Sequence, residues 1–407
     1  MTRHRPELAD VLRSYTPAYL EAFGATLTPD QRRVLRDLLR CRTAALGGHV
    51  EVCADCGHQQ IAYNSCRNRH CPKCQAAQRA RWLEERAAEL LPVEYFHVVF
   101  TLPQPLGRLA WPNRRWLYGT LFRAASETLL QIAADPKHLG GHIGFLAILH
   151  TWGQNLHLHP HVHCVVPGGG LAADGTRWIA CRPGFFLPVR VLSRLFRGKF
   201  LARLDEAFAN RRLTLVGQHQ KLAQPAAFQE WLASLRTQEW VVYAKPPFGG
   251  PEQVLKYLAR YTHRVAIANQ RLIKMEDGKV HFHWKDYAHD NAAKVMALDA
   301  VEFIRRFLHH VLPSGFVRIR HFGFLANRCR SEKLQRCRQL LSVPRPVEEP
   351  RQVTPAPGQA EGAESGCVLR CPVCKQGRMR VVAELPPESP GPGIATATWK
   401  EPTCDTS

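Results

Sequence analysis

Residues 157–170 read HLHPHVHCVVPGGG and place histidines at four alternate positions, the last two being His161 and His163. Alternate side chains of a β-strand lie on the same face, so a strand here would direct both of these imidazoles to one point. Pro160 cannot donate a hydrogen bond to a neighbouring strand, and we therefore expect the strand to begin at His161. A lone histidine is usually structural, but two on one strand face beside a Gly-Gly-Gly turn favour a metal site.

An ion held by two imidazoles usually takes a third protein ligand, and Gln154 is the nearest amide. We include Gln154 in the predicted site, while His150, His159 and His97 stay open as alternatives. Two imidazoles with an oxygen ligand suit Mn²⁺ or Mg²⁺ at a nuclease site, although zinc also binds such ligands. We therefore predict a catalytic Mg²⁺ or Mn²⁺ ion at the histidine pair.

The composition narrows the class of partner. In 407 residues, Lys and Arg outnumber Asp and Glu by 55 to 34, which gives a net charge of +21. Such an excess favours a polyanion, of which nucleic acid is the commonest. With 45% hydrophobic residues the chain can bury a core and form two or three domains. No apolar run is long enough to span a membrane and MTRHRPELAD lacks a signal segment, so we expect a cytoplasmic protein without a membrane partner.

The cysteines cluster in a way that predicts zinc rather than disulfides. Five of the fourteen lie in residues 51–75, EVCADCGHQQIAYNSCRNRHCPKCQ. Cys53 and Cys56 form one C-x2-C pair, Cys71 and Cys74 form another, and four thiolates complete a tetrahedral structural Zn²⁺ site. We therefore expect these four to bind one ion. Three spare ligands lie in the same segment: His58, Cys66 and His70.

The cysteine-rich segment also carries positive charge that is suited to phosphate contact. The predicted DNA-contacting residues are Arg67, Arg69 and Lys73. Residues 5–45 ahead of it have helical patterns, and a second helix over residues 75–91 ends before Pro92. We therefore predict a helical and zinc-binding DNA-recognition domain over residues 1–91.

Residues 92–342 mix β-branched runs with amphipathic helices, which predicts an α+β domain with a mostly antiparallel sheet and flanking helices. Asp277-Gly278 between two of the runs is a strong hairpin signal. The expected strands are 95–102, 143–152, 161–166, 240–244, 267–275, 279–284 and 316–320, and the expected helices are 114–133, 251–265 and 298–311.

From residue 343 the composition shifts to Pro, Glu, Gly and Ala without an apolar period, which predicts a flexible tail over residues 343–407. Cys367, Cys371 and Cys374 interrupt this tail and resemble a zinc knuckle that lacks a fourth ligand. Cys404 is a distant candidate for that ligand. The role of this second knuckle stays open.

A helix over residues 252–264, EQVLKYLARYTHR, supplies candidate nucleophiles. Tyr257 and Tyr261 are four residues apart and so lie on one face of it. Alone, an aromatic stripe usually belongs to a core and a basic stripe to a solvated face. Beside a two-histidine strand in a strongly basic protein, they favour attack of a tyrosine on a DNA phosphodiester. The basic stripe, predicted to hold phosphates, is Lys256, Arg260 and Arg264.

Three segments in this order resemble the IS91 family of rolling-circle transposases, which belongs to the HUH single-strand endonucleases: RNRHCPKCQ, LHPHVHCVVPGGG and YLARYTHRVAIAN. The resemblance runs from about residue 8 to residue 330 and implies the HUH fold. It also implies a bacterial enzyme that nicks DNA at one end of its element and forms a 5′-phosphotyrosine. The released 3′-hydroxyl would prime synthesis by the host replication machinery before the strand is joined to a target.

The resemblance also implies individual roles. His161 and His163 match the HUH pair, and Tyr257 and Tyr261 match the nucleophiles, with Tyr261 preferred if one suffices. The cysteine-rich N-terminal segment matches the zinc-binding, DNA-recognising domain of the family. Two rivals stay open: a plasmid replication initiator that uses the same nickase chemistry, and a zinc-dependent DNA-binding regulator without catalysis.

Overall fold

The computed structural model describes residues 5–248, 253–254, 266–286, 292–341 and 370–388. It confirms the α+β class, and every strand pair in its sheets is antiparallel. The chain forms two compact units, Met1–Val34 with Arg69–Val347 and Leu35–Asn68 with Glu348–Ser407. This division differs from the predicted one, in which residues 1–91 formed one domain and 343–407 a tail.

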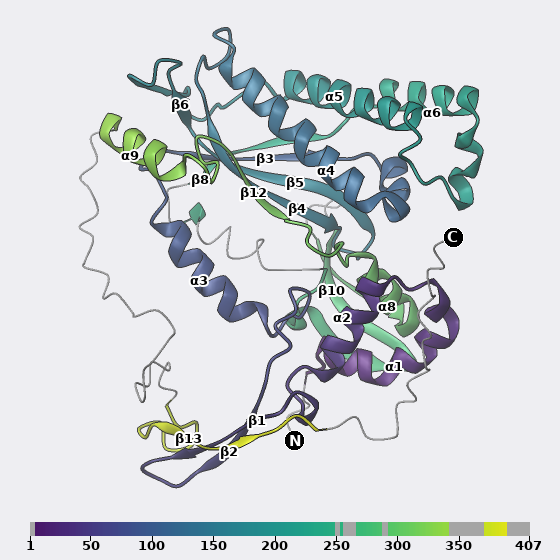
Figure 1. Ribbon diagram of the computed structural model, residues 1–407, viewed down its shortest axis with the longest axis vertical. Coiled ribbons are helices and arrows are strands. Elements are labelled where there is room, and N and C mark those ends of the chain that lie inside the picture. The colour runs from purple at the N-terminus through teal and green to yellow at the C-terminus, as the bar shows by residue number, and fades with distance from the viewer. Residues whose placement is uncertain (1–4, 249–252, 255–265, 287–291, 342–369, 389–407) are drawn as a thin grey trace, which may run out of the picture. The chain divides into compact units, whose positions relative to one another are not determined.

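A five-stranded sheet in the order β12-β4-β5-β3-β8 forms the centre of the first unit (Figure 1). Its β-branched and aromatic runs alternate between two buried faces, which is typical of a central sheet. The strands are β3 (Tyr95–Thr101), β4 (Gly144–Trp152), β5 (Leu158–Pro167), β8 (Val242–Phe248) and β12 (Ile319–Gly323).

Two long helices cover one face of this sheet, α4 (Gln104–Ala134) and α5 (Val189–Ala209), and α6 (Pro225–Thr237) packs against α5 (Figure 1). Phe96, Val98 and Phe100 of β3 point to this side and are at most 1% exposed. Alternate residues of β4 and β5, such as Leu149 and Val162, join the same core. This is the larger apolar core of the first unit. Because side chains alternate along a strand, the residues between these core positions point to the opposite face of the sheet.

The opposite face of the sheet is packed more lightly. Tyr95, Leu146, Ile148 and Val165 are buried there together with Val254. Helix α3 (Gln75–Ala87) packs Trp82 and Leu83 against the same cluster. Because side chains alternate along a strand, the histidines of β3, β4 and β5 share this face.

A smaller three-stranded sheet, in the order β11-β10-β9, completes the first unit with two helices that contact each other, α1 and α8. The predicted hairpin at Asp277-Gly278 is present, and both residues have positive φ, 51° and 70°. Such angles are those of a tight two-residue turn. The elements are α1 (Leu8–Phe23), β9 (Leu272–Glu276), β10 (Lys279–Asp286), β11 (Ala292–Asp299) and α8 (Ala300–His309).

The second unit contains a three-stranded sheet in the order β13-β1-β2, in which a C-terminal strand pairs with an N-terminal hairpin. Its strands are β1 (Gly48–Cys53), β2 (Gln59–Tyr63) and β13 (Met379–Leu385). The other elements within the described residues are α2 (Pro29–Arg40), β6 (Gly169–Leu171), β7 (Trp178–Ala180), α9 (Arg330–Leu340) and the 3-10 turns η1 (Gly24–Thr26), η2 (Ala44–Leu46), η3 (Gly217–Ala223) and η4 (Asn269–Arg271).

Several predicted boundaries need correction. Strand β5 begins at Leu158 rather than His161, because the ladder to β4 shifts register between His150 and Trp152 and this irregularity accommodates Pro160. The strand expected at 316–320 lies at Ile319–Gly323 instead. Most of the helix expected at 251–265 falls outside the described residues.

Candidate metal centres

Three histidines gather on the lightly packed face of the central sheet. His150 of β4 pairs in register with His161 of β5, and His163 follows two residues later on the same side. Each offers a ring nitrogen, and these nitrogens lie within 4.8 Å of one another. The ring centroid of His163 lies 4.3 Å from that of His150 and 4.7 Å from that of His161. The two predicted histidines therefore do converge, and β4 supplies a third imidazole.

Two of these rings are oriented by hydrogen bonds. Nδ1–H of His161 donates to the backbone carbonyl of His159 at 2.6 Å, so its Nε2 carries the lone pair that a metal needs. Nδ1 of His163 lies 2.8 Å from Nε2 of His97, a neighbour on β3. Histidines that ligate metals commonly use the second ring nitrogen in this way. Burial, and secondarily His159, lowers the pKa of His161 to about 4, which keeps the ring in the neutral form that binds metals.

Gln154, the predicted third ligand, lies in the turn between β4 and β5. Its backbone carbonyl accepts a hydrogen bond from Arg271. Arg306 donates to the carbonyl of Asn155 at 3.1 Å, and His310 of the same region donates through Nε2 to the carbonyl of Leu156, also at 3.1 Å. These contacts position the turn, while His150 joins the predicted pair. The two-residue period of β4 indicates which side of the strand His150 lies on, but only the pairing register of β4 with β5 shows that it lies opposite His161.

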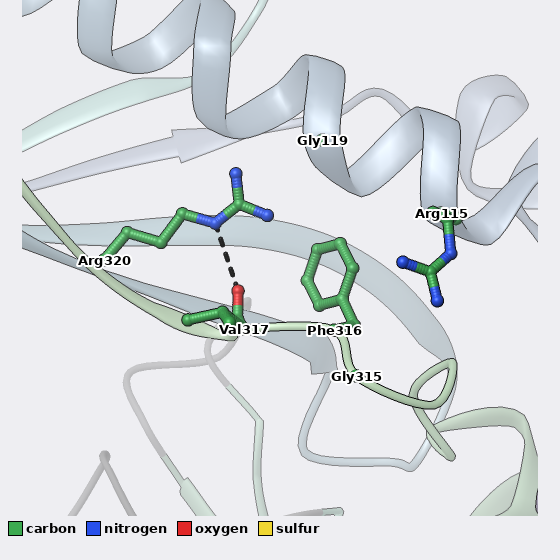
Figure 2. Close-up of a pocket in the computed structure, with 6 residues that line it drawn as sticks. All are labelled: Arg115, Gly119, Gly315, Phe316, Val317 and Arg320. Carbon is green, nitrogen blue, oxygen red and sulfur yellow. Dashed lines mark hydrogen bonds between the residues drawn. The ribbon is translucent and has the colours of Figure 1, made fainter.

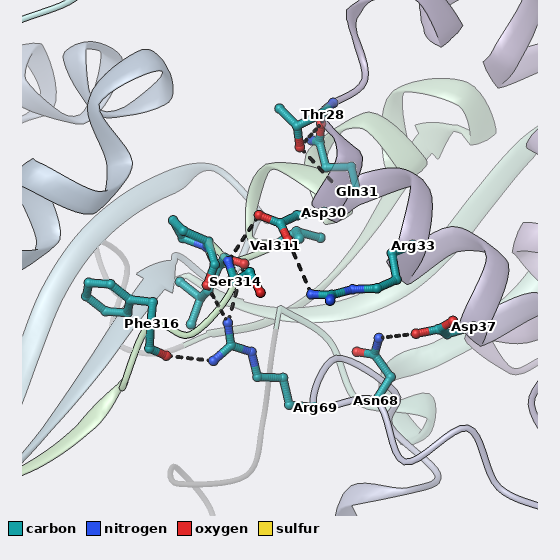
Figure 3. Close-up of polar contacts among 12 residues, drawn as sticks. Thr28, Asp30, Gln31, Arg33, Asp37, Asn68, Arg69, Val311, Ser314 and Phe316 are labelled. Carbon is teal, nitrogen blue, oxygen red and sulfur yellow. Dashed lines mark hydrogen bonds and ion pairs between the residues drawn. The ribbon is translucent and has the colours of Figure 1, made fainter. Parts of the chain in front are cut away.

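A loop ahead of β12 is held by the side chains of Arg69 and Asp30 (Figure 3). Arg69 donates to the backbone carbonyls of Phe316 at 2.6 Å and Pro313 at 2.8 Å. Asp30 accepts from the backbone N–H of Ser314 at 3.1 Å. The loop leads into the strand that pairs with β4, so these contacts support the strand that carries His150.

The predicted DNA-contacting residues of the cysteine-rich segment therefore differ in their surroundings. The guanidinium of Arg69 is engaged with backbone carbonyls, and Lys73 forms an ion pair with Glu7 at 2.5 Å. Arg67 is exposed and adopts a positive φ of 51°. Of these three basic side chains, Arg67 is the best placed to meet a phosphate.

A basic pocket of about 350 Å³ lies beside α4 and the start of β12 (Figure 2). The guanidinium of Arg320 lies 4.3 Å from the ring centroid of Phe122 and donates to the carbonyl of Val317 at 3.1 Å. Phe122 belongs to the core on the α4 side of the sheet. The pocket is thus on the opposite face from the histidines and is separate from them. Its lining residues are Arg115, Gly119, Gly315, Phe316, Val317 and Arg320.

The proposed tyrosine helix enters the described structure only at its start. Residues 253 and 254 are helical, and Val254 is fully buried against Ile148 and Val165 on the face that carries the histidines. The predicted nucleophiles and their basic stripe lie outside the described residues: Tyr257, Tyr261, Lys256, Arg260 and Arg264.

The predicted zinc ligands do not gather as their spacing suggested. Cys53 and Cys56 are joined by Cys371 and Cys374, and the four sulfur atoms lie within 4.8 Å of one another. Pairing of β1 with β13 brings these residues together across more than three hundred positions, which no local spacing reveals. Cys367, the other cysteine of the C-terminal knuckle, lies outside the described residues.

Cys71 and Cys74 also place their sulfur atoms within 4.8 Å of each other, as do Cys41 and Cys66. Both C-x2-C pairs of the N-terminal segment are thus present as close thiol pairs. In addition, the structure gives a partner to Cys66, which the spacing left as a spare ligand. Zinc-binding chemistry is therefore available in this part of the chain.

Among the described residues, no helix has the length and apolar character needed to cross a membrane. A family model described as "Transposase zinc-binding domain" matches residues 11–102, and one described as "Putative transposase" matches residues 144–333. The second match includes the histidine cluster and both tyrosines.

Two known proteins resemble the chain over most of its length. A protein named "Putative transposase y4qJ" from Sinorhizobium fredii is 58% identical over 385 residues, which covers 93% of this chain and 95% of that protein. The transposase for insertion sequence element IS801 from Pseudomonas savastanoi pv. phaseolicola is 27% identical over 320 residues, covering 77% of this chain and 75% of that protein. No solved structure matches the chain. With a zinc-binding segment, a transposase domain and relatives of this length, the chain belongs to the IS91 family of transposases.

Proposed function

We propose that this transposase cuts and rejoins one DNA strand through a tyrosine nucleophile beside a divalent ion held by His150, His161 and His163. The observation that carries the proposal is the position of Val254. This residue is buried on the sheet face that bears the three histidines and precedes Tyr257 by three positions. The segment with both tyrosines therefore starts on the face where the histidines converge.

The donor set fits a divalent ion. Three imidazoles converge, and His161 and His163 are each oriented through Nδ1. Imidazole ligands favour a transition-metal ion, so we expect Mn²⁺ to support the reaction better than Mg²⁺. When bound, the ion would polarise a phosphate oxygen and help to align the strand. Gln154 stays as a candidate for a further ligand from the turn beside the cluster.

The proposed reaction consists of two transfers of one phosphoryl group. In the first, the phenol oxygen of Tyr257 or Tyr261 bonds to phosphorus, and the bond between phosphorus and the 3′ oxygen breaks. The tyrosine proton passes to the leaving oxygen, which becomes a free 3′-hydroxyl, while the 5′ end stays on the protein as phosphotyrosine. In the second, a 3′-hydroxyl attacks this phosphotyrosine and the tyrosine regains a proton. The bond energy is conserved between the steps.

Two tyrosines would permit two such transfers without release of the DNA. The free 3′-hydroxyl would prime host synthesis, as the rolling-circle mode requires. We assign phosphate contacts to the basic residues that accompany the tyrosines, Lys256, Arg260 and Arg264, and to Arg67 in the cysteine-rich segment. The DNA partners are the single-stranded element ends and the target.

The test is covalent capture of DNA. Full-length protein is incubated with Mn²⁺ or Mg²⁺ and labelled single-stranded element ends, and the adduct is located by mass spectrometry. We expect the label on Tyr257 or Tyr261 and its loss in the double variant Tyr257→Phe, Tyr261→Phe. An adduct that survives in the double variant would contradict the assigned nucleophiles, and binding without any adduct would contradict the nuclease function.

Transposition and replication initiation share this chemistry, so a second readout is needed. A marked element on a plasmid, supplied with the wild-type protein, is expected to be recovered at new sites. Recovery of nicked and replicated plasmid without insertion would instead favour the initiator.

A further inference from the structure

The C-terminal segment of the second unit carries a cysteine pair that the zinc-binding family match does not cover, since that match ends at residue 102. We propose that Cys371 and Cys374 complete a zinc site with Cys53 and Cys56, so that segments from the two ends of the chain form one zinc ribbon. This site is distinct from the histidine cluster and does not depend on the proposed nuclease function.

The distances between the sulfur atoms fit one tetrahedral zinc ion. The Sγ atoms of Cys53 and Cys374 lie 3.7 Å apart, as do those of Cys56 and Cys371. Zinc–sulfur bonds of ~2.3 Å at tetrahedral angles place sulfur atoms about 3.8 Å apart. A disulfide would need only ~2.05 Å. All four cysteines are free thiols.

The two C-x2-C pairs have the same backbone design. Each is followed by a residue with positive φ, Gly57 at 71° and Lys375 at 60°. In each, the N–H of that residue donates to the carbonyl of the first cysteine, to Cys53 at 3.1 Å and to Cys371 at 3.0 Å. Such a turn folds two thiols toward one point. The repetition at two places so far apart in the chain is what a ribbon with two knuckles requires.

Backbone N–H groups also point at the sulfur atoms. The N–H of Cys56 lies 3.5 Å from Sγ of Cys53, and the N–H of Val373 lies 3.4 Å from Sγ of Cys371. The N–H of Gly377 lies 3.3 Å from Sγ of Cys374. Donors of this kind stabilise the thiolate form that binds metal.

Gly377 shows how tightly the two knuckles fit. A Cβ atom built at this residue would overlap Sγ of Cys53, a ligand from the other end of the chain. Residue 377 can therefore be only glycine if the two segments are to meet as they do. The N–H of Ala54 also donates to the carbonyl of Arg378 at 3.0 Å, which fixes the same approach.

Among the described residues, the strands that bring the two knuckles together bury few apolar side chains. In β2 the residues alternate between exposed and half-buried, in β13 only the two end residues are half-buried, and no residue of either strand is buried. Ile61 is 53% exposed and Val381 is 59% exposed. A module that cannot bury an apolar core usually depends on a metal or disulfides. Two of the four thiols are themselves well buried, with Cys53 and Cys371 at 2% and 1% exposure.

The test measures zinc per molecule in purified full-length protein by mass spectrometry. We expect the double variant Cys371→Ser, Cys374→Ser to contain one zinc fewer than the wild type, and Cys53→Ser, Cys56→Ser to lose the same one. Because one ion is shared, the quadruple variant should also lose only one. Unchanged zinc in the C-terminal double variant would overturn the proposal, and so would a loss of two in the quadruple variant.

Two further variants separate ligand loss from misfolding. Cys374→His preserves a zinc-binding donor set of three thiolates and one imidazole, so it should keep the ion that Cys374→Ser loses. Loss in both would show that Cys374 acts in packing and would overturn its role as a ligand. Cys329→Ser is the matched control, because its thiol contacts backbone carbonyls and belongs to neither cysteine cluster; it should keep every zinc ion.

Discussion

The histidine cluster of the first unit and the four-cysteine cluster of the second unit can both hold a metal ion, but the fold supports them in different ways. The histidines lie on strands whose neighbours are fully buried, such as Ile148 and Val162 at 0% exposure. The cysteines lie beside strands with side chains as exposed as Val381, at 59%. We infer that the apolar core builds the histidine site before any ion binds, whereas the ion builds the cysteine site. Removing the metal should therefore unfold the second unit and leave the first unit folded.

The largest effect is expected from loss of a histidine ligand. His161→Ala should reduce adduct formation by at least about 10³-fold, because a metal contribution of several kcal/mol corresponds to that factor. DNA binding and thermal stability should change little, since the surrounding core is intact. Nicking rate and DNA affinity are measured on the same preparation. His157→Ala is the control: it lies in the same histidine run but outside the cluster, and it should retain activity. Equal losses in both variants would contradict a metal role for His161.

Zinc removal tests the other half of the comparison. Structural zinc contributes about 10–16 kcal/mol of binding free energy to small domains, so a chelator should unfold the second unit. The first unit should keep its cooperative thermal transition. Limited proteolysis with mass spectrometry should show new cleavage within residues 35–68 and weaker DNA binding. If the chelator leaves that segment protected, or melts both units together, the proposed difference between the two sites is wrong.

A smaller effect is expected one step away from the histidine cluster. His97→Ala removes the imidazole that hydrogen-bonds to Nδ1 of His163, and such a loss typically weakens metal affinity by about 10–100-fold. The concentration of Mn²⁺ that gives half-maximal nicking should rise by that factor, while the rate at saturating Mn²⁺ stays close to that of the wild type. His97→Gln, which can still hydrogen-bond, should recover part of the loss. A lower rate at every Mn²⁺ concentration would indicate that His97 acts in another way.

The sequence predicted the features that depend on local periodicity. The two-residue period around His161 and His163 and the Asp277-Gly278 turn both correspond to what the structure contains. Boundaries at Pro160 were wrong because the register shift that accommodates a proline is a property of the pair of strands, not of one strand.

Features that depend on distant pairing could not be predicted in this way. The spacing joined Cys53 and Cys56 to Cys71 and Cys74, and only the pairing of β1 with β13 shows that Cys371 and Cys374 are their neighbours. His150 was one of several candidates until the β4–β5 register placed it opposite His161. In both cases the sequence predicted which residue types would bind a metal. Only the pairing of the strands shows which of these residues lie together.

The smallest effect concerns the turn that supports the histidine cluster from the side. His310 is buried; Nε2–H donates to the carbonyl of Leu156, and Nδ1 lies 3.2 Å from the hydroxyl of Thr151. Burial lowers the pKa of His310 from 6.5 to about 3, so between these values the unfolded chain binds a proton that the folded chain excludes. The free energy of unfolding therefore rises with pH across this window. As the pH falls from 7 to 5, this one group should lower the free energy of unfolding by about 2 kcal/mol.

His310→Gln cannot titrate, so the free energy of unfolding of this variant should depend less on pH by that amount, as measured by chemical denaturation at each pH. His138→Gln, at an exposed position, controls for the loss of a histidine. An unchanged pH dependence in His310→Gln would show that folding does not lower the pKa of His310. It would also contradict the inference that the apolar core shields the face with the histidine cluster from water.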